Sequence, residues 1–373
     1  MYQSKAAGVP DRHPGPISRP PARTLNILYV SFTRQADRPY LDPSTRYRCF
    51  YPVEAARTLG HRAYVASQAA LAAADPAGFD LVVVHRPSFT PELVRFVRAA
   101  HRAGTRLVAD YDDLIFDPAY AAASSLFDAT WDLAATLRVF ARNTDALRLF
   151  ESFTVSTAPL RDHILALHRD ARVQVLPNGV SPSLWSMIAA RGYQDQSSRP
   201  FIGYFPGTAT HNTDLAVAAA GVAELCRTRG IPLRIVGPVE ADAALFRGVA
   251  VERTGLQPFT SMFDSMAGCR VVIAPLAANP FNQAKSHIKL LEALLSCTAC
   301  VATAIPDMAQ HQGAAGAGPA IPVSLVGDTG DWGAALRDQW DAFDLGAVVR
   351  ARDAVVQEFG AARIYAPLFR DAA

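Results

Sequence analysis

The sequence predicts an α/β protein of two Rossmann-like domains that face each other across a cleft. Short apolar runs alternate with helical segments, which is typical of a parallel sheet with helices on both faces. A polar stretch at residues 192–200 interrupts this alternation, which then begins again. The length of 373 residues is enough for two domains, each with its own core.

The first alternating series predicts an N-terminal domain over residues 25–190. Its apolar runs are typical of buried parallel strands. Gly60 and Gly104 each follow an expected helix, at the position where helices commonly end. The expected strands are Leu25–Ser31, His61–Ala66, Asp80–His85, Arg106–Asp110, Ser152–Ser156 and Val173–Leu176, and the expected helices are Tyr51–Leu59, Pro91–Ala103, most of 119–150 and Ala158–His168.

The second series predicts a C-terminal domain over residues 191–346. We expect residues 347–373 to carry a final helix, Ala347–Phe359, that crosses back to the N-terminal domain. Residues 1–24 combine prolines with scattered arginines and lack an apolar run, so we expect a disordered tail rather than a signal peptide. The expected strands are Phe201–Phe205, Leu233–Val236, Val271–Ala274 and Cys300–Thr303, the expected helices are Leu215–Gly230 and Lys285–Ser296, and 207–212 and 313–320 are expected loops.

Composition and charge exclude several classes of protein. The net charge of +2 lacks the basic excess of a nucleic-acid binder. No apolar run approaches the ~20 residues that span a bilayer, so we expect a cytoplasmic protein, with peripheral contact at the inner membrane face left open. Five cysteines form no disulfide framework. Cys297 and Cys300 have the spacing of a redox or zinc pair but no second ligand pair, so we expect buried thiols.

The best-marked candidate site is the segment from Pro275 to Ala293. The N-terminus of the expected helix attracts phosphate, and Lys285 and Ser286 add a cation and a hydroxyl there. Glu292 lies seven residues after Lys285, on the same face of the expected helix, where a carboxylate can bind ribose hydroxyls. The alternative is an ordinary capped amphipathic helix.

A second candidate is the glycine loop after the strand Phe201–Phe205. Gly207 allows backbone amides to approach a phosphate, and Thr208 and Thr210 can donate to it. The signal is weak because many α/β proteins carry a strand, a glycine and a helix in this order. The chain has neither a G-x-G-x-x-G motif after its first strand nor a Walker lysine motif, which argues against NAD enzymes and P-loop NTPases.

A third candidate is the acidic run Asp110–Asp113 at the end of an expected strand. Carboxylates at this edge point toward the cleft, where Asp112 and Asp113 could act as a base, bind an acceptor hydroxyl or stabilise developing positive charge. Turn and helix-capping roles are the alternative. A metal site is disfavoured because no further cluster is spaced to complete it.

Basic residues on neighbouring loops form the last candidate. Arg46 and Arg48 precede an expected helix and could contact the acceptor or a diphosphate, although a solvated basic turn fits equally well. His85 and Arg86 end a strand and are expected to face the cleft, in either a structural or a contact role.

The order of several segments resembles the family-four retaining glycosyltransferases of the GT-B class, especially those of bacterial surface-polysaccharide clusters. The resemblance covers nearly the whole chain beyond residue 24. It rests on STRYR, DYDDLIFD, TVST, VLPNGV, IGYFPGTATHNTD and IAPLAANPFNQAKSHIKLLEA, of which the last is the most specific.

This resemblance implies a role for each candidate residue. It places Asp112 or Asp113 near the reacting sugar carbon, and Glu292 at the second glutamate of an E-x7-E pattern that contacts the ribose. The first glutamate falls at Ala284, which lacks a carboxylate. The implied diphosphate loop contains Gly207, Thr208 and His211, and the implied donor-sugar and phosphate loop contains Asn279, Phe281, Asn282, Lys285 and Ser286. His211 and Asn212 stand where the family usually has an Arg/Lys pair.

The implied function is transfer of a sugar from a nucleotide-diphosphate sugar to a glycan or lipid-linked glycan, with retention, in surface polysaccharide, lipopolysaccharide or glycoconjugate biosynthesis. The resemblance implies no metal and no cofactor apart from the donor substrate, and leaves UDP and GDP open. Ala284 motivates one alternative, a catalytically silent relative that acts as a binding subunit. A sugar-nucleotide 2-epimerase, which needs no acceptor, is another.

Overall fold

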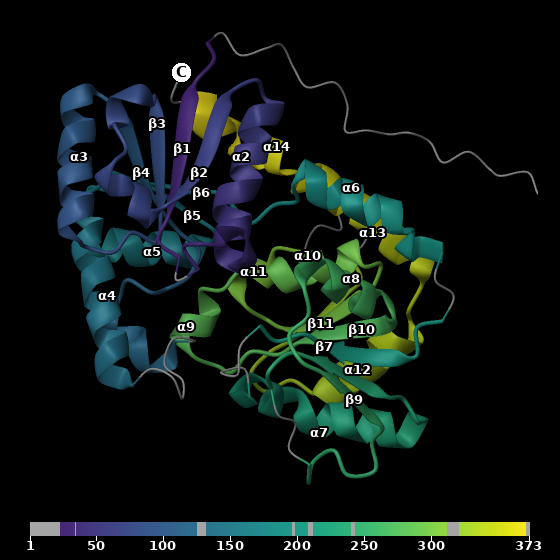
Figure 1. Cartoon of the computed structure of the whole chain (residues 1–373). Helices are drawn as coiled ribbons and strands as arrows, with labels where there is room; N and C mark the ends of the chain where they lie inside the picture. The colour runs from purple at the N-terminus through teal and green to yellow at the C-terminus, as the bar shows by residue number, and fades with distance from the viewer. Residues whose placement is uncertain are drawn as a thin grey trace, which may run out of the picture.

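The computed structural model describes residues 23–33, 35–124, 132–195, 198–207, 212–239, 243–311 and 321–370. Within these ranges the chain forms two parallel six-stranded sheets, each flanked by helices (Figure 1). The strand orders are β2-β1-β3-β4-β5-β6 and β12-β11-β10-β7-β8-β9. Most of the expected tail, Thr208, Thr210, His211 and the expected loop 313–320 lie outside the described residues.

The first sheet contains all the strands that the sequence predicts for it. β3 is buried at every position, as its unbroken apolar run predicts. The Thr90 side chain accepts a hydrogen bond from the Leu93 amide at the start of α3, and Gly104 ends that helix in a left-handed conformation. The strands are β1 (Asn26–Ser31), β2 (Arg62–Ser67), β3 (Leu81–His85), β4 (Arg106–Tyr111), β5 (Ser152–Val155) and β6 (Arg172–Val175), and the helices are α1 (Pro43–Thr45), α2 (Tyr51–Thr58), α3 (Pro91–Ala103), α4 (Leu133–Leu147), α5 (Ala158–Leu167) and α6 (Pro182–Arg191).

The second sheet adds two strands that the sequence analysis missed, β9 and β12. Both lie at the edges of the sheet, and β9 is mostly exposed, so neither shows a buried apolar run. The strands are β7 (Phe201–Tyr204), β8 (Leu233–Val236), β9 (Val251–Thr254), β10 (Cys269–Ala274), β11 (Ala299–Thr303) and β12 (Val323–Val326), and the helices are α7 (Asn212–Arg229), α8 (Phe259–Ala267), α9 (Pro280–Gln283), α10 (Ile288–Leu295), α11 (Pro306–Ala309), α12 (Trp332–Asp341), α13 (Leu345–Glu358) and α14 (Ala361–Arg370).

The predicted helix Lys285–Ser296 is wrong at its N-terminal end. The chain first forms the short helix α9, capped by the Asn279 side chain, and α10 begins only at Ile288. Lys285 therefore lies in the turn between two helices and does not share a helical face with Glu292. The amide of His287 at the start of α10 donates to the Asp307 carboxylate at 2.8 Å, so a side chain already supplies negative charge there.

The end of the chain joins the two halves of the molecule. α13 packs against α10, and α14 packs against α2 of the first domain, where it is drawn in yellow in Figure 1. Val180, after β6, bridges to Gly360 between these two helices. A side chain at Gly179 would lie 2.7 Å from Ile364 and 2.8 Å from the carbonyl of Phe359, so this close approach requires glycine.

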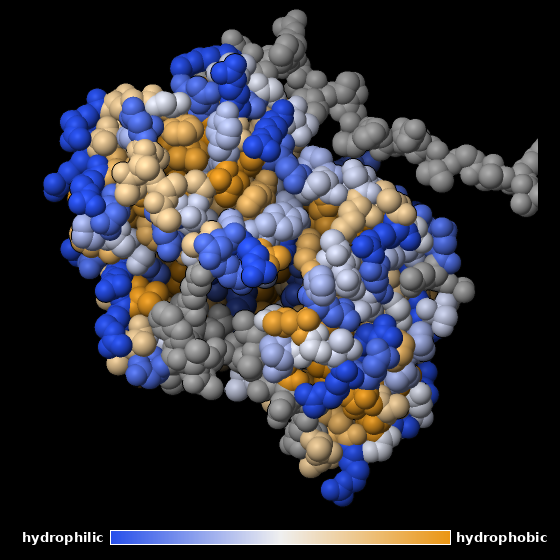
Figure 2. Space-filling model, in the orientation of Figure 1, coloured by the Kyte–Doolittle hydropathy of each residue, from blue (hydrophilic) through white to orange (hydrophobic). Residues whose placement is uncertain are grey.

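The largest apolar cluster takes buried residues from both domains. The face seen in Figure 2 is mostly hydrophilic, and hydrophobic residues show through in small groups, several of them where the two domains meet. All five cysteines are buried with free thiols, as predicted. None of the described helices has the length and apolar character to cross a bilayer.

A buried pair of histidines should make the stability pH-dependent. The rings of His287 and His311 lie 4.6 Å apart, and both contact Phe359. Burial, and after it the neighbouring His287, lower the pKa of His311 to about 4. A histidine held neutral by folding stabilises fully above its unfolded pKa of about 6.5, and this contribution is lost as the pH falls toward 4.

We therefore expect the contribution of His311 to the free energy of unfolding to fall by about 2 kcal/mol between pH 7.5 and pH 5, because at this residue the unfolded chain binds a proton that the folded chain excludes. Urea unfolding at the two pH values measures this difference. His311→Leu, which cannot titrate, should remove most of it. An unchanged pH dependence in that variant would assign the effect to another group.

Candidate functional site

A cavity of about 310 Å³ lies between the two sheets, at the carboxyl ends of their strands. Open parallel sheets commonly bind ligands at this edge. The cavity brings together seven of the residues predicted from sequence: Arg86, Asp112, Asp113, Gly207, Lys285, Ser286 and Glu292. A side chain at Gly207 would meet no atom within 4 Å and would point into open space.

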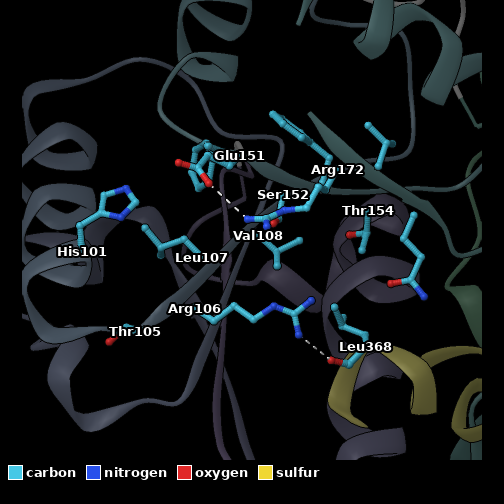
Figure 3. A pocket seen from close by; sticks show the side chains of 14 residues that line it. His101, Thr105, Arg106, Leu107, Val108, Glu151, Ser152, Thr154, Arg172 and Leu368 are labelled. Carbon is cyan, nitrogen blue, oxygen red and sulfur yellow. Dashed lines mark hydrogen bonds and ion pairs between the residues drawn. The ribbon is translucent and has the colours of Figure 1, made fainter. Parts of the chain in front are cut away.

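A larger cavity, of about 640 Å³, lies elsewhere on the N-terminal domain (Figure 3). Arg106, Ser152 and Arg172, the first residues of β4, β5 and β6, line it. Arg172 pairs with Glu151 at 3.2 Å, and both side chains are about three quarters exposed. This cavity lies at the opposite, amino end of the strands and contains none of the predicted site residues, so we place the candidate site in the smaller one.

A buried ion pair lies beneath the candidate site. Arg48 contacts both carboxylate oxygens of Asp110, at 2.5 and 3.1 Å, and also donates to the carbonyl of Leu176 at 2.7 Å. Burial alone would raise the pKa of Asp110, but the charge and hydrogen bonds of Arg48, together with the hydrogen bond from His85, outweigh burial and the pKa is lowered. Arg48 does not line the cavity. Its ion pair fixes the π-helical turn Arg46–Phe50, which precedes α2, to the end of β4.

Arg46 and His85 also stand outside the cavity. Arg46 donates to the carbonyl of Tyr40 at 3.2 Å, and its guanidinium lies 3.8 Å from the centre of the Phe259 ring of the C-terminal domain. It therefore packs at the junction of the domains. His85 is buried between Asp110, at 2.8 Å from Nδ1, and Ser44, at 2.8 Å from Nε2. The sequence analysis did not single out Ser44, which lines the cavity.

Arg86 brings a positive charge to the two acidic residues of the cavity. Its backbone has a φ of 52°, a left-handed conformation that is unusual for a residue other than glycine. Its Nε donates to Asp112 at 2.6 Å, and its Nη2 lies 3.8 Å from Asp113. The guanidinium therefore pairs with Asp112 and lies near Asp113, and all three side chains line the cavity.

The two neighbouring carboxylates differ in their proton affinity. Burial would raise the pKa of Asp112, but the charges of Arg86 and His85 and the hydrogen bonds from Arg86 and Ser44 together outweigh burial and hold the pKa far below its usual range. Burial raises the pKa of Asp113, and Arg86 and Lys285 offset only part of that rise. Asp112 is therefore a fixed anion, and Asp113 is the better candidate for exchanging a proton with a ligand.

The predicted donor loop divides into residues at the cavity and residues that shape the loop. Lys285 and Ser286 line the cavity, and Asn178 of the N-terminal domain donates to the Ser286 hydroxyl at 2.9 Å. Phe281 is fully buried in the apolar cluster of the N-terminal domain. Asn282 bonds to Asp214 at 3.2 Å and to the carbonyl of Ala277 at 2.9 Å. Asn279, as the cap of α9, completes this framework.

Glu292 reaches the cavity from α10 and is only 4% exposed. Tyr47 of the N-terminal domain donates to its Oε1 at 3.2 Å, and Lys289 donates to its Oε2 at 2.8 Å. Sequence reasoning missed both partners. The spacing of Lys289 three residues before Glu292 on a helix is the local signal that could have found it. Tyr47 is 245 residues away, and only the assembled domains bring it there.

The described residues show no group of three His, Cys, Asp or Glu side chains placed to hold a metal ion. The acidic residues of the cavity are instead contacted by arginine, lysine and hydroxyl groups.

No protein-family model matches the chain, and no curated protein matches it in sequence. Solved structures do match it. HepE of Anabaena, in complex with UDP and glucose, has a TM-score of 0.56 at 14% identity over 93% of this chain and 99% of HepE. A glycosyltransferase of Rickettsia africae has a TM-score of 0.58 at 10% identity, over 94% of this chain and 98% of its own.

An alpha-glucosyltransferase in complex with UDP and DNA has a TM-score of 0.62 at 10% identity, over 94% of this chain and 99% of its own. At such identities the likeness shows the fold. The chain has the GT-B fold of these glycosyltransferases, and the predicted fold class is confirmed.

Proposed function

We propose that this chain is a glycosyltransferase that moves a sugar from a nucleoside-diphosphate sugar to a hydroxyl of a glycan or lipid-linked glycan, with retention at the anomeric carbon. The observation that carries the proposal is the meeting of Lys285, Glu292 and Asp113 in one cavity between the two sheets. They supply a cation for a diphosphate, a carboxylate for ribose hydroxyls and a carboxylate for the acceptor hydroxyl.

In the proposed reaction the bond between the anomeric carbon and the diphosphate oxygen breaks, and a bond from that carbon to the acceptor oxygen forms on the same face. The departing diphosphate gains negative charge, which Lys285 and the backbone amides near Gly207 stabilise without a divalent metal. Asp113 accepts the proton of the acceptor hydroxyl as the acceptor oxygen bonds to the anomeric carbon. Closure of the domains over the donor keeps water from the reacting carbon.

We propose UDP as the first nucleotide to test, since the structures of HepE contain UDP and UDP-glucose. Surface-polysaccharide or other glycoconjugate synthesis in the cytoplasm is the proposed setting, with lipid-linked acceptors met at the inner membrane face.

A catalytically silent relative that binds the donor is the second candidate, and Ala284 favours it. Its side chain is 1% exposed within the apolar cluster of the N-terminal domain, and its carbonyl accepts from Thr157 at 2.9 Å. In this chain Ala284, at the position where similar enzymes have a glutamate, therefore packs against the N-terminal domain.

A thermal-shift screen with UDP, GDP, dTDP and CMP, without added metal, tests donor binding. We expect UDP to raise the melting temperature, because a ligand that binds only the folded state stabilises it. Glu292→Gln should weaken UDP binding by roughly tenfold, the effect of about one charged hydrogen bond. Glu358→Gln, at an exposed glutamate of α13, is the matched control.

Absence of any shift at millimolar nucleotide would reject the donor site. Binding without UDP release across a broad acceptor panel would favour the silent relative. Conversion of the donor in the absence of acceptor would indicate the 2-epimerase.

A further inference from the structure

A continuous line of side-chain contacts connects the buried ion pair to the cavity. Asp110 Oδ2 lies 2.8 Å from Nδ1 of His85, and Nε2 of His85 lies 2.8 Å from the hydroxyl of Ser44. This hydroxyl donates to Asp112 Oδ2 at 2.6 Å. Arg48 and Arg86 hold the two carboxylates at the ends of the line. The side chain of His85 is 1% exposed and that of Asp112 is 11% exposed.

The hydrogens available along this line fix the charge of His85. An ionised carboxylate accepts hydrogen bonds and donates none, so the single hydrogen of the Ser44 hydroxyl points to Asp112. Ser44 can then only accept from Nε2 of His85. Asp110 likewise accepts from Nδ1. Both ring nitrogens therefore carry a hydrogen, and His85 is an imidazolium.

The surrounding charges favour this cation. His85 faces Asp110 directly and Asp112 at 3.8 Å. Arg48 also contacts Asp110, and Arg86 also contacts Asp112. With Asp113 included, three cationic side chains then face three carboxylates. At the cavity Lys289 pairs with Glu292 at 2.8 Å, which leaves the charge of Lys285 to compensate a ligand.

We propose that Ser44 is a positioning residue, which links a cationic His85 to Asp112 and so holds Asp112 and Arg86 in place while Asp113 receives the acceptor hydroxyl. This role rests on the proposed glycosyl transfer. Ser44 contributes only its hydroxyl, because its backbone amide separately donates to Asp42 at 2.9 Å in the cap of α1. Ser44→Ala removes the link and leaves that cap intact.

Without the hydroxyl, Nε2 of His85 loses its acceptor, and its distance of 3.8 Å from Asp112 is too long for a direct hydrogen bond. Asp112, which accepts from Arg86 at 2.6 Å, loses one of the two side chains that donate to it, so the pair of Asp112 and Arg86 is held less firmly. Ser44→Thr keeps a hydroxyl and should keep the link.

The test combines ring-nitrogen NMR with steady-state kinetics. In protein labelled with ¹⁵N-histidine, with the His85 signals assigned by their loss in His85→Gln, both nitrogens should be protonated at pH 7.5. Ser44→Ala should leave Nε2 of His85 without its acceptor, which changes the ¹⁵N signal of that nitrogen. It should also lower kcat by roughly 10- to 100-fold, as expected for misplaced reacting groups, with KM for the donor unchanged.

Ser44→Thr should restore both the NMR signature and kcat. Ser183→Ala is the matched control, since this serine donates to Glu54 at 2.6 Å at the surface, and we expect it to behave as the wild type. A neutral His85 ring in the wild-type protein, or Ser44→Ala with wild-type kcat, would overturn the inference. Absence of turnover in the wild-type protein contradicts only the glycosyl transfer, because the NMR signature is read without substrate.

Discussion

Replacing Lys285 with alanine is expected to lower kcat/KM by roughly 10²- to 10³-fold, the usual effect of removing one group that stabilises developing negative charge. Lys285 lies in the turn between α9 and α10, lines the cavity, and is near enough to influence the proton affinity of Asp113. A cation in this position compensates the charge of the departing diphosphate. UDP release from the sugar donor, followed with and without acceptor, measures the effect.

Two variants make this result specific. Lys285→Arg keeps the charge and should retain part of the activity. Arg247→Ala removes an exposed cation of the same domain and should leave the rate unchanged. Activity of Lys285→Ala within threefold of the wild type would show that the diphosphate charge is compensated elsewhere.

The second large effect is expected on stability. Arg48→Met should lower the free energy of unfolding by about 3–5 kcal/mol, since removing one partner of a buried ion pair leaves the other charge buried and only partly compensated. Arg48 is fully buried, and Asp110 also contacts His85 and Thr154, so the carboxylate cannot move to water. Urea unfolding at pH 7 measures the loss.

The matched control is Arg229→Met, which breaks the ion pair with Asp341 on the surface. These side chains are 43% and 52% exposed, so water solvates the remaining charge and we expect no measurable change. A loss of less than about 1 kcal/mol in Arg48→Met would mean that the π-helical turn Arg46–Phe50 rearranges and lets solvent reach Asp110.

The sequence predicted those parts of the fold that leave a local pattern. Strands such as β3 and β11 are buried at every position, and a buried parallel strand is an unbroken apolar run. The edge strands β9 and β12 carry no such run and were missed. The helix that contains Glu292 was predicted to begin at Lys285, three residues too early. The spacing of its apolar residues does not reveal that Asn279 caps a separate short helix just before it.

The candidate site followed a similar division. Lys285 and Glu292 were predicted because the segment that contains them resembles a motif of the family-four glycosyltransferases. The roles of Arg48 and Phe281 were not found, since each is decided by a distant partner. Arg48 is buried only because Asp110, 62 residues away, neutralises it. The residues around Arg48 in the sequence do not show which carboxylate the fold will bring to it.

The burial of Phe281 has a consequence for exchanging domains between related enzymes. This residue belongs in sequence to the nucleotide-binding half, yet its side chain packs into the apolar cluster of the other half, and α9 contacts the turn at residues 118–123. A chimera that takes one half from a relative would place a foreign side chain in this pocket, or leave it empty. Recombination between such proteins should therefore preserve Phe281 together with the residues that surround it.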